Sequence, residues 1–354
     1  MNTLSLYVHL PFCITKCGYC DFNSYALDTF LEKGRAGADW APRYADALVR
    51  ELEGRCRSRG LGRRILRSIF FGGGTPSLFP AGETARVLET VRRLFSLTPG
   101  CEITLEANPG AADAERFEAL AEAGVNRISI GVQSFDDAAL RRLDRVHTGE
   151  EARAAFRAAR ASGFENISLD LMFGIPFQRP GDAAADIEEA LRLEPEHISA
   201  YELTIEPGTA FHARREREEL PGLADEEDAL RMWELRDRLL GEAGYERYEI
   251  SNFARPGFRC RHNMNYWRRG EYLGVGAGAH SLLAGMRTWN HARPDVYVAK
   301  TGDEKAAADP AAGEEDVRGG RKALGEALML GLRLKEGVSL EDISVAAGAD
   351  PEEA

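Results

Sequence analysis

Six short apolar runs alternate with helical segments in the first part of the chain, and this alternation restricts the fold more than any other feature. Each run is rich in Val, Ile, Leu, Phe or Tyr. The runs cover residues 4–10, 68–71, 102–107, 127–132, 166–173 and 197–205. Between them, 84–97 has apolar residues at helical spacing, and the Ala-rich stretches 111–123 and 150–162 are strong helix formers. Strands that alternate with helices pair in parallel through right-handed crossovers. We therefore predict an α/β fold, a partial (β/α)6 barrel that is open on one side.

A second region is expected after the barrel. We predict that residues 1–250 form the barrel and that 251–354 form a junction and a small, mainly helical domain. Segment 322–334 has an amphipathic pattern, and Ser339 is a candidate N-cap for another helix. This region is too short to close a core of its own.

Two other stretches are predicted to lie on the surface. Segment 212–228 is heavily charged and is expected to form a solvated insertion. Segment 301–320 is rich in Ala, Gly, Asp and Glu and is expected to be a flexible loop.

Residues with useful chemistry fall where the predicted strands end. Parallel α/β folds place their ligands at the carboxyl ends of the strands. The residues are the glycines 72–74, Glu106, Gln133, Asp170 and Glu206. Glycines let a backbone approach a ligand closely, and buried polar side chains need partners. A ligand hydroxyl or amine would serve, but so would a helix cap or an internal ion pair. Arg145 could pair with a carboxylate.

Cys13, Cys17 and Cys20 form the pattern C-x3-C-x2-C. Such tight spacing lets one loop hold an iron–sulfur cluster. Three thiolates leave one iron of a four-iron cluster without a protein ligand, and an open metal position is where chemistry occurs. A zinc site would more often pair two C-x2-C units or add histidines. The place where a fourth cysteine would fit holds Phe22.

The composition excludes several classes of protein. A net charge of −12 argues against a general nucleic-acid binder. Six cysteines in 354 residues do not indicate a disulfide framework. The first residues lack the basic and apolar regions of a signal peptide, and no uncharged apolar stretch is long enough to span a bilayer. We expect a cytoplasmic protein.

The segment His-Asn-Met-Asn-Tyr-Trp at 262–267 is the second unusual cluster. Histidine, methionine and tyrosine can ligate haem iron, and aromatic neighbours suit a flat macrocycle. The alternative is a capped turn with Tyr266 and Trp267 packed into the domain junction. The residues alone leave both interpretations open.

Taken together, the cysteine loop, the glycine loop and the polar strand ends resemble the radical S-adenosylmethionine superfamily. More narrowly, the chain is similar to the oxygen-independent coproporphyrinogen III dehydrogenase branch. The resemblance implies that the cysteines hold a [4Fe–4S] cluster and that S-adenosylmethionine chelates the fourth iron. An electron from the cluster would then cleave the sulfonium, giving methionine and a 5′-deoxyadenosyl radical, while the protein positions the cofactor. The implied S-adenosylmethionine contacts are Tyr7, Gly73, Gly74, Thr75, Glu106, Gln133, Arg145 and Asp170.

Two kinds of protein in this branch could correspond to this chain, the dehydrogenases and the haem chaperones. The dehydrogenases typically have a fourth cysteine, C-x3-C-x2-C-x-C, after a longer N-terminal extension, whereas this chain has Phe22 and only twelve residues before Cys13. The haem chaperones have a signature similar to Cys-Asp-Phe-Asn-Ser-Tyr (20–25) and an H-N-x-x-Y-W motif, and both are present. The implied haem-binding residues are His262, Asn263, Tyr266 and Trp267.

We therefore expect a protein that carries haem as cargo to acceptor proteins, respiratory ones among them. The alternative is an oxygen-independent coproporphyrinogen III oxidase or dehydrogenase. Either interpretation implies an electron donor such as flavodoxin or ferredoxin. A homodimer is compatible with the resemblance. The C-terminal module of the family usually extends further than this chain does, so the resemblance implies that the small helical domain is truncated here.

Overall fold

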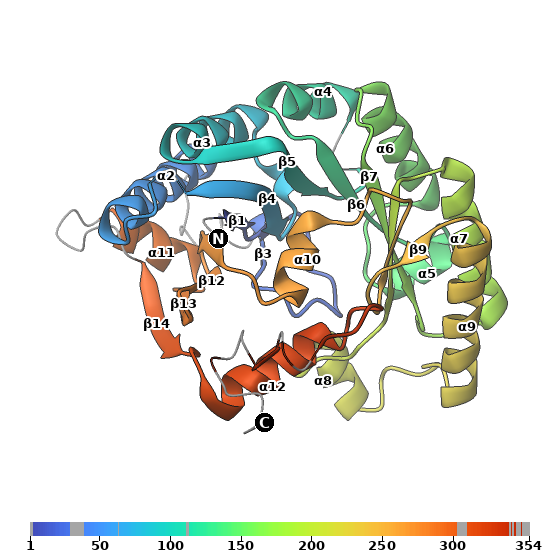
Figure 1. Ribbon diagram of the computed structural model, residues 1–354. Helices are drawn as coiled ribbons and strands as arrows, with labels where there is room; N and C mark the ends of the chain where they lie inside the picture. The colour runs from blue at the N-terminus through green and yellow to red at the C-terminus, as the bar shows by residue number, and fades with distance from the viewer. Residues whose placement is uncertain are drawn as a thin grey trace. The chain divides into compact units, whose positions relative to one another are not determined.

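Figure 1 shows the structure, a computed structural model. The chain divides into two compact units. Unit 1 consists of Met1–Pro11, Asp28–Thr104 and Cys260–Ala354, and unit 2 of Phe12–Leu27 and Leu105–Arg259. The described residues are 3–28, 39–62, 64–110, 113–302, 310–339, 341, 343–344 and 348.

Unit 1 is built on a mixed sheet whose central strands are parallel. In order across the sheet, its strands are β14 (Ala311–Asp316), β13 (Met286–Asn290), β12 (His280–Leu283), β11 (Tyr272–Val275), β1 (Thr3–Leu10), β4 (Ile65–Gly73) and the first part of β5 (Ser96–Ala107). β1 pairs in parallel with both β4 and β11. From β11 outward, β12, β13 and β14 pair antiparallel. Leu4, Leu6 and Val8 of β1 are fully buried, so this strand lies in the core of the unit.

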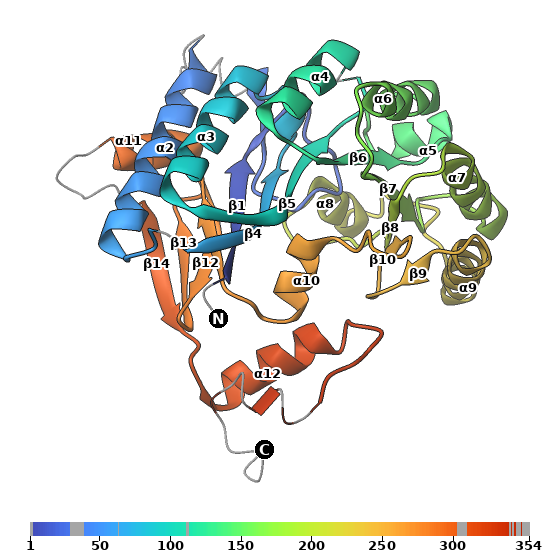
Figure 2. The ribbon, with the colours of Figure 1, turned by 45° about the horizontal axis from the view of Figure 1, so that its top comes forward.

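Helices cover the sheet of unit 1. α2 (Trp40–Ser58) and α3 (Ala81–Leu94) run side by side, and α11 (Pro294–Thr301) packs against α2 (Figures 1 and 2). α10 (Arg261–Trp267) packs against β4 and also contacts α12 (Gly320–Gly331). The 3-10 turn η1 (Pro76–Leu78) follows β4. Burying the apolar stripe of such helices, for example Tyr44, Leu48 and Leu52 of α2, supplies most of their stability.

A buried carboxylate joins several elements of unit 1. Glu51 of α2 forms an ion pair with Arg55 at 2.8 Å and accepts hydrogen bonds from Asn290 Nδ2 (2.8 Å), Tyr297 Oη (2.7 Å) and Gly276 N (2.9 Å). Burial raises the pKa of Glu51, while Arg55 and these donors oppose the shift. One side chain therefore connects α2 to α11, to β13 and to the turn after β11.

Unit 2 contains the second parallel set. β6 (Arg127–Gln133), β7 (Ile167–Phe173) and β8 (His197–Glu202) are parallel, and β10 (Asn252–Ala254) and β9 (Glu246–Arg247) follow antiparallel. Its helices are α4 (Ala114–Ala123), α5 (Asp137–Arg142), α6 (Gly149–Ala161), α7 (Pro180–Leu193), α8 (Ala210–Glu216) and α9 (Glu226–Glu242). A short parallel pair, β2 (Phe12–Cys13) and β3 (Tyr25–Ala26), lies in the N-terminal segment of this unit.

The α/β class and the six predicted strands are confirmed, since the runs correspond to β1, β4, β5, β6, β7 and β8. The strands β11, β12, β13 and β14 were not predicted. β14 lies inside 301–320, so the flexible loop expected there is wrong for its described end. The helix pattern at 322–334 corresponds to α12. The charged segment 212–228 contains most of α8 and the start of α9.

Some expectations stay predictions. The domain boundary at residue 250 is one of them. The helix expected after Ser339 falls largely outside the described residues, and so does the end of the chain. Within the described part of the chain, no helix combines the length and the apolar composition needed to cross a membrane.

The Glu51 network gives a stability prediction. Arg55→Ala leaves the buried carboxyl without its cationic partner and should lower the free energy of unfolding by about 3 kcal/mol or more. Arg50→Ala, an exposed position of the same helix, should change it by less than about 0.5 kcal/mol. Guanidinium unfolding of both variants measures the difference, and equal losses would contradict a special role for the buried pair.

Candidate functional site

The three motif cysteines lie on one loop of unit 2 that is closed at both ends. Pairing of Phe12 with Tyr25 and of Cys13 with Ala26 joins its ends. Inside the loop, Lys16 Nζ donates to the carbonyl of Phe22 at 2.8 Å, and Cys20 N donates to Cys17 O at 3.2 Å. Cys13 is buried, Cys17 and Cys20 are half-buried, and all are free thiols. Phe22 is 61% exposed, so the side chain at the place of a fourth cysteine faces solvent.

Gly18 fixes the loop against α8. Phe211 N donates to Gly18 O at 2.8 Å. A Cβ at position 18 would lie 2.4 Å from Asp144 Oδ2 and 2.6 Å from the Phe211 ring. The next residue, Tyr19, packs edge-on against the same ring with centroids 6.2 Å apart. Only glycine fits this approach, so the course of the cysteine loop depends on this residue.

Arg145 brings positive charge to the cysteines. Its Nη1 donates to Cys17 Sγ at 3.6 Å, and its Nη2 donates to Asn108 Oδ1 at 2.8 Å and to Gly131 O at 2.6 Å. The contact places a cation directly beside one of the motif sulfurs. Burial raises the pKa of the Cys20 thiol, against the opposing effects of the Phe22 amide, the Ser24 hydroxyl and Lys16.

The donor set fits a cluster better than a single ion. Among the described residues, no three His, Cys, Asp or Glu side chains converge on one metal position. Each thiolate of an iron–sulfur cluster binds a different iron, so the three sulfurs need not converge. Three thiols on a single loop beside a half-buried cation match that requirement.

Gln133 and Asp170 lie near Arg145 in the same unit. Gln133 ends β6 in the left-handed region, with φ 67°. A Cβ on Gly131 would lie 3.0 Å from Gln133 Nε2 and 3.4 Å from Arg145 Nη2, so both side chains approach this glycine. Asp170 pairs in register with Gly131 and accepts a hydrogen bond from Ser129 Oγ at 2.9 Å. Burial raises the pKa of Asp170.

Unit 2 therefore brings together the cysteines, Arg145, Gln133 and Asp170. Glu106 lies at the end of β5, half-buried, in the same unit.

The glycine loop belongs to unit 1. Gly73 ends β4 with φ 116°, and a Cβ there would lie 2.4 Å from the His9 ring. Gly74 N donates to Leu10 O at 2.8 Å, and Tyr7 Oη lies 2.9 Å from His9 Nδ1. Parallel pairing of β1 with β4 thus places Gly72 opposite His9 and Gly73 opposite Leu10, whereas Tyr7 lies opposite Phe70. Thr75 follows directly and is buried.

Within unit 1, the H-N-x-x-Y-W segment forms α10, and its histidine points into the core. His262 is 1% exposed and stacks on Phe70 with centroids 5.1 Å apart. Its Nδ1 lies 3.0 Å from Ser68 Oγ, and its Nε2 lies 3.0 Å from Tyr266 Oη.

The neighbours of α10 fix it in place. The Glu102 carboxylate accepts from Arg261 N at 3.0 Å and from His262 N at 3.1 Å, which satisfies free amides at the helix start. Asn263, Tyr266 and Trp267 are half-buried, and the Arg333 guanidinium lies 4.4 Å from the Trp267 ring. In this conformation both ring nitrogens of His262 have partners, so binding of iron would require one contact to open.

Several residues that shape these sites were not anticipated from the sequence. They are His9, Lys16, Gly18, Glu102 and Asn108. Lys16 and Gly18 lie inside the cysteine motif and could have been noticed there. The others act through partners that are remote in the sequence, so no local signal marks them.

Comparison with known proteins identifies the family of the chain. The family model described as the radical SAM superfamily matches residues 7–190. The chain is 44% identical to the heme chaperone HemW of Haemophilus influenzae over 282 residues, 79% of this chain and 70% of that protein. It is 45% identical to HemW of Escherichia coli over 280 residues, with the same two coverages. HemW of Mycobacterium tuberculosis is 39% identical over 342 residues, 96% of this chain and 84% of that protein.

Among solved structures, coproporphyrinogen III oxidase HemN of Escherichia coli, a radical SAM enzyme, superposes with a TM-score of 0.80. The match covers 98% of this chain and 79% of that chain at 23% identity, so it concerns the fold. The predicted α/β fold of the radical SAM type is thereby confirmed. The chain therefore belongs to the radical SAM superfamily and, within it, to the family of the HemW heme chaperones.

Proposed function

We propose that this protein is a haem chaperone that binds haem as cargo and passes it to acceptor proteins. The observation that carries this proposal is the 44–45% identity to curated HemW proteins over 79% of the chain. Phe22 supports it, because its exposed ring stands where the dehydrogenases have a fourth cysteine.

We further propose a [4Fe–4S] cluster on Cys13, Cys17 and Cys20, with S-adenosylmethionine as its partner. When bound, this pair supplies one-electron cleavage of a sulfonium. Within unit 2, Lys16 and Gly18 hold the loop in shape, and Arg145 places a cation beside Cys17. The contacts to S-adenosylmethionine named from the resemblance stay predictions.

The remaining parts of the proposal concern partners and location. An electron donor such as flavodoxin or ferredoxin would reduce the cluster. Respiratory proteins are the expected haem acceptors, and a homodimer is compatible with the family resemblance. A cytoplasmic location completes the proposal.

Haem binding at α10 would depend on a local rearrangement. The Nε2 of His262 would have to exchange Tyr266 Oη for iron, because both ring nitrogens have partners. The half-buried Tyr266 is the partner nearer to solvent, whereas Ser68 is fully buried. We therefore propose that Tyr266, and not Ser68, gives way when haem binds.

The haem site is tested by His262→Phe, which keeps a ring to stack on Phe70 and removes both nitrogens. Haem titration followed by absorbance should show affinity lowered about tenfold or more. His280→Ala removes an exposed histidine of the same unit and should bind haem like the parent chain. A thermal melt checks that the variant is folded. Equal affinity in His262→Phe would remove this residue from the site.

The enzyme alternative is tested with the reconstituted protein under anaerobic conditions. We expect no protoporphyrinogen IX from coproporphyrinogen III when S-adenosylmethionine and a reductant are supplied. Product analysis by chromatography measures this, with a coproporphyrinogen III dehydrogenase as the positive control. Multiple turnovers would overturn the chaperone proposal in favour of oxidative decarboxylation.

The cysteine loop is tested through Gly18. In Gly18→Ala the added methyl group would collide with Asp144 and Phe211, so the loop should shift and hold less cluster. We expect iron and sulfide per chain to fall to about half or less after reconstitution, a loss of occupancy comparable to that from disturbing residues around a metal. Gly62→Ala has open space around the new methyl group and serves as the control. Full iron content in Gly18→Ala would show that the loop tolerates the change.

A further inference from the structure

The turn that follows β6 has a conformation that needs outside support. Gln133 is not a glycine, yet it adopts φ 67°. The pairing of β6 with β7 also shifts register between Gly131 and Gln133. A left-handed conformation costs a residue of this type about 1 kcal/mol or more and persists only where the surroundings enforce it.

Asp186 of α7 supplies that support from one side. Its Oδ2 accepts from Ser134 Oγ at 2.7 Å, and its Oδ1 accepts from Phe135 N at 2.7 Å. Ser134 Oγ in turn accepts from Asp136 N at 3.0 Å, and Gln178 Nε2 lies 3.4 Å from Asp186 Oδ2. The carboxylate thus binds the two residues that directly follow Gln133.

The Asp186 side chain is well suited to hold a backbone. It is 5% exposed. Burial raises its pKa to about 6, while the Phe135 amide and the Ser134 hydroxyl oppose the shift. At neutral pH it is therefore mostly ionised, and hydrogen bonds to an ionised acceptor are about twice as strong as neutral ones.

The segment between α5 and α6 holds the turn from the other side. Arg145 donates to Gly131 O at 2.6 Å, and His147 Nε2 lies 3.0 Å from Val132 O. Gly149 lies so close that a Cβ there would be 2.2 Å from Phe135 O. These contacts secure the strand before Gln133 and the turn after it.

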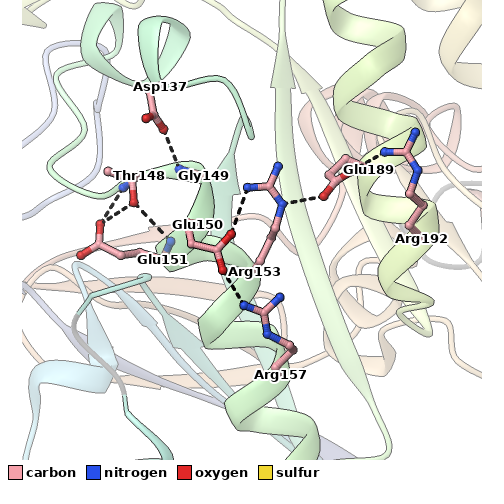
Figure 3. A network of polar contacts seen from close by, with 9 residues as sticks. All are labelled: Asp137, Thr148, Gly149, Glu150, Glu151, Arg153, Arg157, Glu189 and Arg192. Atoms are coloured by element: carbon pink, nitrogen blue, oxygen red, sulfur yellow. Dashed lines mark hydrogen bonds and ion pairs between the residues drawn. The ribbon is translucent and has the colours of Figure 1, made fainter.

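Polar contacts at the start of α6 hold this segment (Figure 3). Gly149 N donates to Asp137 Oδ1 at 2.8 Å, and Thr148 and Glu151 form a capping box. Arg153 extends the network to Glu189 of α7 at 2.5 Å. The helix that carries Asp186 is thereby linked to the helix that begins beside the turn.

We propose that Asp186 is a positioning residue which holds the β6–α5 turn so that the Gln133 side chain stays directed at the cofactor. This inference rests on the proposed function, because it requires Gln133 to contact S-adenosylmethionine. Asp186 itself accepts hydrogen bonds from Ser134, Phe135 and Gln178, and it affects the cofactor through the position of Gln133.

The test uses Asp186→Asn in the full chain, reconstituted anaerobically. An amide keeps the shape but replaces one acceptor oxygen with a donor group, so it cannot accept from both Ser134 and Phe135. Isothermal titration with S-adenosylmethionine should show affinity lowered about tenfold, as expected for a lost hydrogen bond to a charged group. Glu188→Gln, an exposed carboxylate of the same helix, should bind like the parent chain. Iron content should be unchanged in both.

A double variant separates positioning from general destabilisation. In a Gln133→Ala background, Asp186→Asn should weaken S-adenosylmethionine binding by less than about twofold further, because coupled residues are not additive. An equal tenfold loss in that background would overturn the proposal. So would parent-like affinity of Asp186→Asn, or parent-like affinity of Gln133→Ala alone.

Two further outcomes are distinguishable. If Asp186→Asn does not fold, Ser134→Ala removes the bridging hydroxyl and should give the same dependence on Gln133; additive losses there would overturn the proposal. If the reconstituted parent chain does not bind S-adenosylmethionine, the proposed function itself fails, and this inference fails with it.

Discussion

Parallel pairing of strands is the constraint on which the remaining structure depends. It turns the carboxyl ends of β1 and β4 in unit 1, and of β6, β7 and β8 in unit 2, toward one edge of each set. In unit 1 this brings Gly73 against His9. In unit 2 it sets Asp170 beside Gly131, where Arg145 also binds. Residues that are far apart in the sequence become neighbours because their strands end together.

Two buried carboxylates, Glu51 and Asp186, are each surrounded by hydrogen-bond donors. Glu51 receives hydrogen bonds from several elements of unit 1, and Asp186 receives them from the turn after β6. In each case the carboxylate fixes the direction of particular backbone N–H groups, which apolar packing alone cannot do. Arg145 does the converse in unit 2, since one guanidinium binds a carbonyl, an amide oxygen and a thiol. Such groups specify geometry more than they add stability.

The parts that the sequence predicts well are those with a local signal. The six predicted strands, β1 and β4 to β8, are runs rich in apolar residues, and the three cysteines are recognised by their spacing. β14 has no such signal, because its Ala-Ala-Gly-Glu-Glu-Asp sequence is poor in strand formers and it exists by pairing with β13. Ser134 and Asp186 likewise carry no local signal in the sequence. The fold brings Ser134 Oγ to 2.7 Å from Asp186 Oδ2. The burial of His262 could not be foreseen, since it depends on Phe70 and on Ser68 of another element.

The way the cysteine loop is held has a consequence for the order in which its shape forms during synthesis. The pairing of β2 with β3 and the contact of Lys16 with Phe22 join residues that are close in the sequence, so they can form as soon as this segment is made. Asp144, Arg145 and Phe211, which pack against the loop at Gly18 and Cys17, lie far along the chain and are made later. The closed loop can therefore exist before the groups that fix its final geometry, and the three thiols reach their mutual positions only when most of unit 2 has been synthesised.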